Sequence, residues 1–265
     1  MKIGLIAGYG KMVDIVSSAL EKEGHEIVFI NIAKDREAEG VSNETHLYLE
    51  NLEDFLTFLK KNAITHIAFA GKIDKTKIIN NFSSSFEDKY QNIDKGDLNL
   101  LIAFQTLLKD YGIEVVNLSK YLKNYITEKK LYTNTPLLSK EKEDLYFGAK
   151  RIKILADMEI GQTMVLRDKM IYAVEAVEGT NECIRRAGAL GAKGGIVIKV
   201  GRTSQRFDME IPVIGFETVK VASESGMRIV AIESGRTLFI ERNKAISFAN
   251  EMGIKIVGFS IEGEI

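Results

Sequence analysis

Short apolar runs alternate with segments of helical periodicity in the first half of the chain. The apolar runs are β-prone, and the segments between them place apolar residues three or four positions apart. Strands are predicted at 2–7, 26–32, 66–70 and 114–118, and helices at 12–20, 52–62 and 98–111. Strands that alternate with helices form parallel sheets with right-handed crossovers. We therefore predict a Rossmann-like, doubly wound N-terminal domain over residues 1–130.

The second half of the chain has a different rhythm. Residues 122–143 lack sustained periodicity, and we place a linker at 131–142. Two β-prone runs flank Asp168 and Lys169, a pattern typical of a hairpin. Strands are predicted at 162–167, 170–177, 195–200, 228–232, 237–240 and 255–258, and helices at 143–158, from about 181, and at 218–225. These elements predict a mixed α/β C-terminal domain over residues 143–265, so that the whole chain is of the α/β class.

Composition restricts the classes of function. The 265 residues are 45% hydrophobic and 28% charged, as a packed globular chain requires. The chain has 36 basic and 37 acidic residues and a net charge of -1, so no overall field attracts nucleic acid. A single cysteine, Cys183, and three scattered histidines leave no internal disulfide and no zinc-ligand spacing. We expect a cytoplasmic protein without a signal peptide or a membrane-spanning helix.

Two glycine-containing turns follow predicted strands of the N-terminal domain. Gly8 and Gly10 stand where a dinucleotide fold bends, and such a turn lets a phosphate approach backbone N–H groups. Val13 replaces the third glycine of the nicotinamide fingerprint, and Asn31 replaces its acidic residue, so a tight turn is the favoured interpretation. Lys72 follows the third strand and could hold a phosphate, with a solvated lysine as the alternative.

A loop in the C-terminal domain carries a more specific pattern. A strand that alternates toward Glu175 and Glu178 runs into Gly179, Thr180 and Asn181 before a helix. Such a loop offers free N–H groups and a hydroxyl at the positive end of a helix, where an anion or a carboxylate-bound magnesium ion would be stable. The alternative is an ordinary helix start capped by Thr180 or Asn181.

A charged segment, residues 199–212, follows the next predicted strand. If this segment is extended, the alternation of Arg206, Asp208 and Glu210 places the three charges on one face. Such a group can bind a phosphate and a cation together, and the alternative is an exposed, salt-bridged loop.

Taken in order along the chain, these motifs resemble the UDP-2,3-diacylglucosamine pyrophosphatase family of the lipid A pathway. The resemblance covers both domains. The matching motifs are Ala70-Gly71-Lys72, Gly96-Asp97, Ile160-Gly161-Gln162, Ala173-Val174-Glu175-Ala176-x-Glu178-Gly179-Thr180, Lys199, Gln205 and Pro212-x-Ile214-Gly215.

The resemblance implies a hydrolase that depends on Mg2+ or Mn2+ and splits UDP-2,3-diacylglucosamine into UMP and 2,3-diacylglucosamine 1-phosphate. It also implies a nucleotide-sugar or phosphorylated lipid as ligand, peripheral contact with the cytoplasmic face of the inner membrane, and a homodimer as an option. Metal ligation is assigned to Glu178 and Asp208, and catalysis to Arg206, Asp208 and Glu210. Substrate binding is assigned to Gly8, Gly10, Lys72, Asp97, Gln162, Gly179, Thr180, Asn181, Lys199, Arg202 and Gln205.

The sequence departs from the family pattern at several of these positions. Asn181 stands where the family has an aspartate, Arg206 where it has an acid, and Asp208 where it has an arginine. Moving the carboxylate by two residues along a strand, from position 206 to position 208, displaces it by roughly 6–7 Å. The family's mechanism could not operate unchanged after such a displacement. Two interpretations follow: a divergent pyrophosphatase, or a catalytically impaired nucleotide- or lipid-phosphate-binding protein of the same fold.

Overall fold

A computed structural model describes residues 1–31, 52–71, 97–205 and 211–262. The chain divides into two compact units, with the boundary between Lys123 and Asn124. We call them the N-terminal unit and the C-terminal unit. The helix predicted to open the second domain begins at Ser139, inside the range 131–142 that the sequence predicted as a linker.

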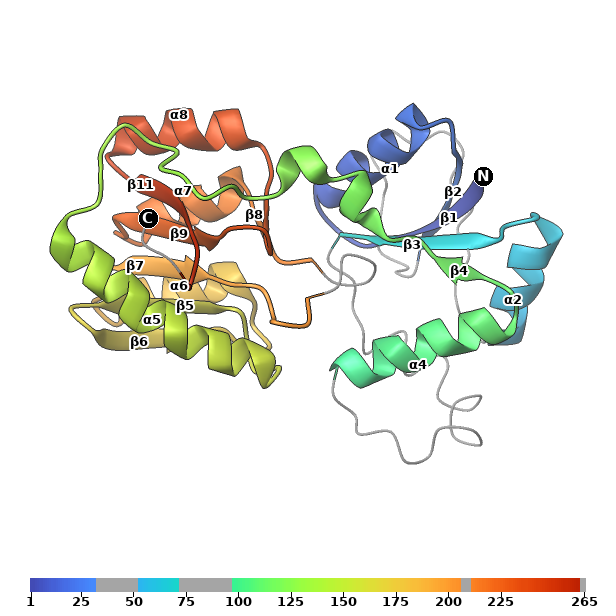
Figure 1. The fold of residues 1–265 in the computed structure, drawn as a ribbon, viewed down its shortest axis with the longest axis horizontal. Coiled ribbons are helices and arrows are strands. Elements are labelled where there is room, and N and C mark those ends of the chain that lie inside the picture. The colour runs from blue at the N-terminus through green and yellow to red at the C-terminus, as the bar shows by residue number, and fades with distance from the viewer. Residues whose placement is uncertain (32–51, 72–96, 206–210, 263–265) are drawn as a thin grey trace. The chain divides into compact units, whose positions relative to one another are not determined.

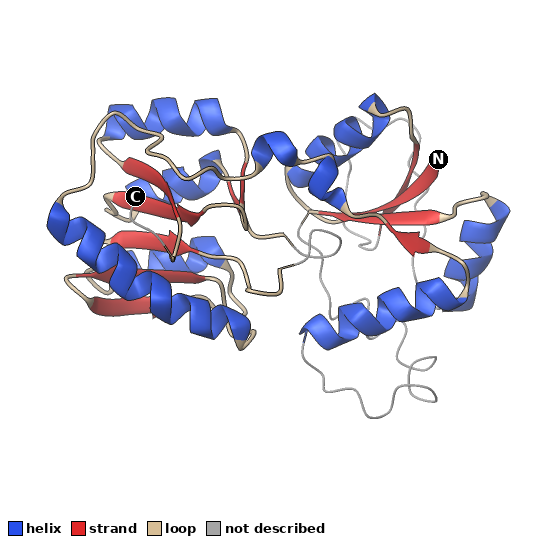
Figure 2. Ribbon diagram, in the orientation of Figure 1, coloured by secondary structure: helices blue, strands red, loops and turns tan. Residues whose placement is uncertain are grey.

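The N-terminal unit is built on a four-stranded parallel sheet (Figures 1 and 2). The strand order is β2-β1-β3-β4, so the chain moves to one side of β1 and then returns to the other. This parallel sheet agrees with the predicted crossover pattern. The elements are β1 Lys2–Ala7, α1 Met12–Lys22, β2 Glu26–Asn31, α2 Leu52–Lys61, β3 His66–Ala70, α4 Asp97–Asp110, β4 Glu114–Val115 and the 3-10 turn η1 Leu118–Lys120. A second 3-10 turn, η2 Lys123–Tyr125, spans the boundary between the two units.

Apolar residues on the strands account for the stability of this sheet. Helices α2 and α4 pack Phe55, Leu59 and Phe104 against strand residues such as Ile6 and Ile67. All five side chains are buried, as expected for a sheet with helices on its faces. Helix α1 lies on the opposite side of the sheet from α4 (Figure 1).

The C-terminal unit contains a five-stranded mixed sheet in the order β11-β9-β7-β5-β6. Strands β7, β9 and β11 are parallel, and β5 is antiparallel to both β7 and β6. The elements are α5 Ser139–Asp157, β5 Thr163–Arg167, β6 Met170–Val174, α6 Thr180–Ala189, β7 Ile196–Lys199, β8 Val213–Ile214, α7 Phe216–Glu224, β9 Ile229–Glu233, β10 Leu238–Phe239, α8 Arg242–Met252 and β11 Lys255–Phe259. The predicted α/β class is thus confirmed for both halves of the chain.

Side chains alternate between two cores on either face of this sheet. Val197 and Val230 pack with α6, α7 and α8, whereas the neighbouring Ile196 and Ile229 pack with α5. This alternation is the period of two that a strand imposes. The result is a three-layer arrangement in which α5 covers one face (Figure 1).

Local sequence signals account for most boundaries, and a few elements differ from expectation. The hairpin turn at Asp168 and Lys169 is confirmed, and both residues have positive φ angles (52° and 60°), as a type I′ turn requires. Strand β4 is shorter than predicted because Asn117 accepts a hydrogen bond from the Ser119 N–H and begins a 3-10 turn. Helix α8 was not predicted, because its buried residues are small alanines rather than large apolar side chains.

Candidate functional site

Several of the predicted site residues meet at one edge of the C-terminal sheet. Strand β7 ends at Lys199, and the antiparallel β5 begins beside it at Thr163. Strand β6 leads into Glu175, whose N–H donates to the Thr163 carbonyl oxygen at 2.8 Å. Helix α6 begins nearby at Thr180. This is the carboxyl end of the parallel strands, where α/β proteins commonly bind ligands.

Four side chains at this edge form a polar group that we call the Lys199 cluster: Thr163, Glu175, Thr180 and Lys199. The ammonium group of Lys199 donates to the hydroxyl oxygens of Thr180 at 2.7 Å and Thr163 at 3.1 Å. It also lies 3.4 Å from Oε2 of Glu175. The Thr180 hydroxyl donates to Oε1 of Glu175 at 2.8 Å. Because Lys199 is only 5% exposed, its charge depends on these partners for stabilisation.

The surroundings keep Glu175 ionised despite its burial. Burial is the largest single influence and would raise the pKa of this carboxyl group. The charge of Lys199 and hydrogen bonds from Thr163, Thr180 and Lys199 together outweigh it and lower the pKa. The Glu175 carboxylate therefore forms an ion pair with Lys199, and the formal charges of the two side chains balance within the protein.

Helix α6 starts in a way that leaves its first turn available to an anion. Gly179 is the N-cap residue, with φ of 81°, and no side chain in the described part of the chain caps the helix. The alternative of a cap by Thr180 or Asn181 is therefore wrong, because the Thr180 hydroxyl is bonded within the Lys199 cluster instead. The first N–H groups of a helix carry a partial positive charge and bind anions.

Glu178 lies in the turn before α6, where its carboxylate is already engaged. Oε1 pairs with the Arg186 guanidinium, and Oε2 accepts the Ala176 N–H at 3.0 Å. The hydrogen bond from Arg186 is the main cause that lowers the pKa of Glu178. Arg186 also donates to the Val174 carbonyl oxygen at 2.8 Å, so the pair stabilises the turn. The predicted role of Glu178 in metal binding stays a prediction.

The loop after β7 brings two further predicted residues to the same edge. The Arg202 N–H donates to Oε1 of Gln205 at 3.2 Å, and the Gln205 N–H donates to the Arg202 carbonyl oxygen at 3.1 Å. Gln162 approaches from β5, where its carbonyl oxygen accepts the Val200 N–H at 3.0 Å. Arg206, Asp208 and Glu210 lie outside the described residues.

The N-terminal unit has its own glycine-lined edge. Gly8 donates its N–H to the Ala70 carbonyl oxygen at 2.8 Å, which joins the turns after β1 and β3. A Cβ atom on Gly71 would lie 2.7 Å from the Tyr9 carbonyl oxygen, so only glycine fits there. Gly10 has a φ of 97° in the same turn. Asp97 opens α4, and Lys72 lies outside the described residues.

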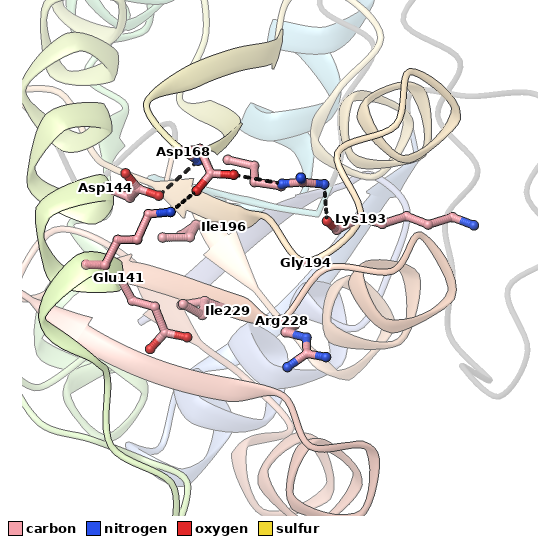
Figure 3. Close-up of a pocket in the computed structure, with 10 residues that line it drawn as sticks. Glu141, Asp144, Asp168, Lys193, Gly194, Ile196, Arg228 and Ile229 are labelled. Carbon is pink, nitrogen blue, oxygen red and sulfur yellow. Dashed lines mark hydrogen bonds and ion pairs between the residues drawn. The ribbon is translucent and has the colours of Figure 1, made fainter.

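A separate cavity of about 190 Å³ lies at the amino ends of the C-terminal strands (Figure 3). Of its charged side chains, Asp168 pairs with Lys140 and Arg167, which also line the cavity, and Glu141 pairs with Lys255 outside it. The cavity includes none of the residues that the sequence assigned to the site. We therefore place the candidate site at the opposite, carboxyl edge.

Glu175 was predicted as part of a motif but without a role, and Thr163 was not predicted as a site residue. The signal that could have indicated Thr163 is its polarity, because the three residues that follow it in β5 are apolar and Thr163 is buried with them.

The fold and this edge define the class: a two-unit α/β protein that gathers a buried lysine, a glutamate and an uncapped helix start at the ends of its parallel strands. The family model of the LpxI N-terminal domain matches residues 2–125, and that of the LpxI C-terminal domain matches residues 128–257. The chain therefore belongs to the LpxI family, which confirms the resemblance.

A curated relative is similar over part of the chain. The UDP-2,3-diacylglucosamine pyrophosphatase LpxI of Caulobacter vibrioides is 29% identical over 109 residues. The aligned stretch covers 38% of this chain and 39% of the relative.

Proposed function

We propose that this protein hydrolyses the pyrophosphate of UDP-2,3-diacylglucosamine to UMP and 2,3-diacylglucosamine 1-phosphate. The observation that carries the proposal is the match of LpxI family models to both halves of the chain. In the reaction, a water oxygen bonds to one phosphorus, and the bridging oxygen leaves with the other phosphoryl group. Such a reaction needs groups that bind and neutralise the pyrophosphate oxygens.

The carboxyl edge of the C-terminal unit supplies groups suited to this task. The uncapped first turn of α6 offers N–H donors to a phosphate oxygen. Lys199 holds the Thr180 side chain at that turn. We propose that Gly179, Thr180, Asn181, Arg202 and Gln205 contact the phosphates from this edge.

Metal dependence is a separate part of the proposal. Within the described ranges, no three His, Cys, Asp or Glu side chains lie close enough to hold a metal ion, and Glu178 is bonded to Arg186. The described residues therefore do not by themselves fit a metal site. We propose dependence on Mg2+ or Mn2+ on the strength of the resemblance, with Asp208, outside the described residues, as a ligand.

The test is release of UMP from UDP-2,3-diacylglucosamine by the purified full-length protein. We expect turnover with Mg2+ or Mn2+ and its loss after EDTA treatment, with recovery when the metal is restored. Turnover that survives EDTA would reject the metal proposal only. No UMP in any condition would reject the hydrolase, and binding of the substrate without turnover would support the alternative below.

The alternative is a nucleotide- or lipid-phosphate-binding protein that has lost catalysis. The replacement of acidic family residues by Asn181 and Arg206 favours it. We expect the double variant Arg206→Asp with Asp208→Arg, which restores the family order, to raise hydrolysis by up to about 100-fold. The single variant Arg206→Asp is the control, because it restores only one of the two positions. Unchanged or lower activity of the double variant would contradict the charge-swap interpretation.

Because the proposed substrate carries two acyl chains, we further propose peripheral contact with the cytoplasmic face of the inner membrane. On the strength of the resemblance alone, we also propose a homodimer in solution. No helix among the described residues is both long enough and apolar enough to cross a bilayer. Flotation with lipid vesicles and sedimentation in detergent-free buffer would test the two proposals.

A further inference from the structure

A buried ion pair holds the start of the loop after β7. The loop consists of Gly201–Gln205. Glu233, the last residue of β9, accepts the Gly201 N–H through Oε2 at 2.8 Å. Lys153 of α5 donates to the Gly201 carbonyl oxygen at 2.7 Å and to the two Glu233 carboxylate oxygens at 3.0 and 3.2 Å. Both polar groups of the Gly201 backbone are therefore bound by this one ion pair.

Two more charged residues hold the next turn of the loop. Asp157 of α5 accepts the Thr203 N–H at 2.6 Å and the Thr203 hydroxyl at 2.7 Å. Arg236 donates to the carbonyl oxygens of Arg202 at 3.2 Å and Thr203 at 2.8 Å. Its Nε also lies 3.5 Å from Oε1 of Glu233. The four charges sum to zero, so the network needs no outside ion for neutrality.

The Lys153–Glu233 ion pair restricts the geometry of the loop more than it adds to the free energy of unfolding. The side chains of Lys153 and Glu233 are 15% and 6% exposed. A buried ion pair adds little net stability compared with apolar residues of similar size, but its directional bonds admit few alternative arrangements. A Cβ atom on Gly201 would lie 2.8 Å from the Arg236 carbonyl oxygen, so the backbone itself closely approaches the turn that follows β9. These contacts therefore hold the loop in one position relative to β9 and α5.

We propose that Glu233 and Lys153 are positioning residues for the site at the carboxyl edge. By binding both polar groups of the Gly201 backbone, they fix the loop that begins two residues after Lys199 and carries Arg202 and Gln205. They act through that loop and not by touching the substrate. This inference rests on the proposed function for its kinetic consequence, but its structural consequence does not depend on any substrate.

The experiment compares Glu233→Gln and Lys153→Met with Glu141→Gln in the full-length protein. Glu141 is a matched control because it also pairs with a buried lysine, Lys255, and also accepts a backbone N–H, that of Leu138. It lies at the opposite edge of the sheet, beside the cavity of Figure 3. For each variant we would measure Tm, hydrogen exchange of the Gly201 and Thr203 amides, and KM and kcat for UDP-2,3-diacylglucosamine.

We expect all three variants to lower Tm, but only the first two to speed exchange at Gly201 and Thr203. In those two, KM should rise about 10-fold or more with a smaller change in kcat, because a displaced loop weakens binding. Lys153→Arg, which keeps the charge and the donors, should restore most of the loss. Unchanged exchange at Gly201 in Glu233→Gln, or an equal rise in KM in Glu141→Gln, would overturn the inference.

Failure of the proposed function has a different signature. If the wild-type protein releases no UMP, the hydrolase proposal is rejected, while the exchange measurement still decides whether Glu233 and Lys153 hold the loop. Faster exchange confined to Gly201 and Thr203 would then support the inference, and slow exchange in both variants would reject it.

Discussion

Replacing Lys199 with methionine should lower the free energy of unfolding by about 3–5 kcal/mol, because it leaves the buried Glu175 carboxylate without its cation. Hydrolysis of UDP-2,3-diacylglucosamine should fall by about 100-fold or more, since Thr180 loses the bond that holds it at the start of α6. Urea unfolding and UMP release measure the two effects.

Lys140→Met is the control for this variant. Lys140 also pairs with a carboxylate, that of Asp168, but its side chain is 73% exposed and lies at the opposite edge of the sheet. Exposed ion pairs contribute little to stability, so neither unfolding nor hydrolysis should change appreciably. An equally small effect of Lys199→Met would show that the Lys199 cluster is not important for either property.

The contribution of Glu175 to the pH dependence of stability should also change sign in Lys199→Met. In the wild-type protein the pKa of Glu175 is lowered below its ordinary 4.5, so its contribution is complete above pH 4.5 and is lost as pH falls through the folded-state pKa. Without Lys199, burial is the largest influence on Glu175 and is opposed only by hydrogen bonds from the two threonines, so we expect the pKa of Glu175 to rise. The deficit of the variant should therefore shrink as pH is lowered from 7 toward 5, and urea unfolding at several pH values would detect it.

The second large effect is expected from Gly161→Ala. A Cβ atom at this position would lie 1.8 Å from the Glu175 carbonyl oxygen, which is backbone and cannot rotate away. The end of β6 must move, so we expect a loss of about 3 kcal/mol of stability and about a 100-fold lower rate. Denaturant unfolding and UMP release, measured below the Tm of the variant, would separate the two.

Gly148→Ala provides the matched comparison. Its Cβ atom would lie 2.1 Å from Cδ2 of Leu166 and 2.5 Å from Cδ1 of Ile198, both at the ends of side chains that can adjust. We expect a smaller loss of stability and a smaller fall in activity, because these side-chain ends can shift without moving the backbone that carries Lys199 and Glu175. Equal losses of activity in the two variants would contradict the idea that the Glu175 backbone must keep its place.

Elements whose structure depends on neighbouring residues were predicted correctly from the sequence. The bounds of β1 and β3, the hairpin turn at Asp168, and the start of α6 near Thr180 all follow from local signals: apolar runs, turn residues and glycines. Helix α8 was missed because Ala245 and Ala249 give no clear apolar stripe. Its place is determined by packing against α7 and the sheet.

The candidate site was predictable only in part, because many of its contacts join residues that are far apart in the chain. The residues 178–181 and Lys199 were recognised as a group by their motifs, and the structure places Thr180 and Lys199 in direct contact. No sequence pattern indicated that the Thr180 hydroxyl binds inside a polar cluster rather than capping its helix. Nor did it point to Lys153 and Glu233, which lie 80 positions apart in the chain.

The amino-acid sequence by itself determined the α/β class, the alternation of elements and the family, because periodicity and motif order are properties of neighbouring positions. Only the tertiary structure decided which charges are paired. Thr163 meets Lys199 across 36 positions through antiparallel pairing of β5 and β7, and Glu233 meets Lys153 where β9 ends beside α5. Such pairs depend on strand order and register, which are decided by packing across the whole sheet and not by any single segment.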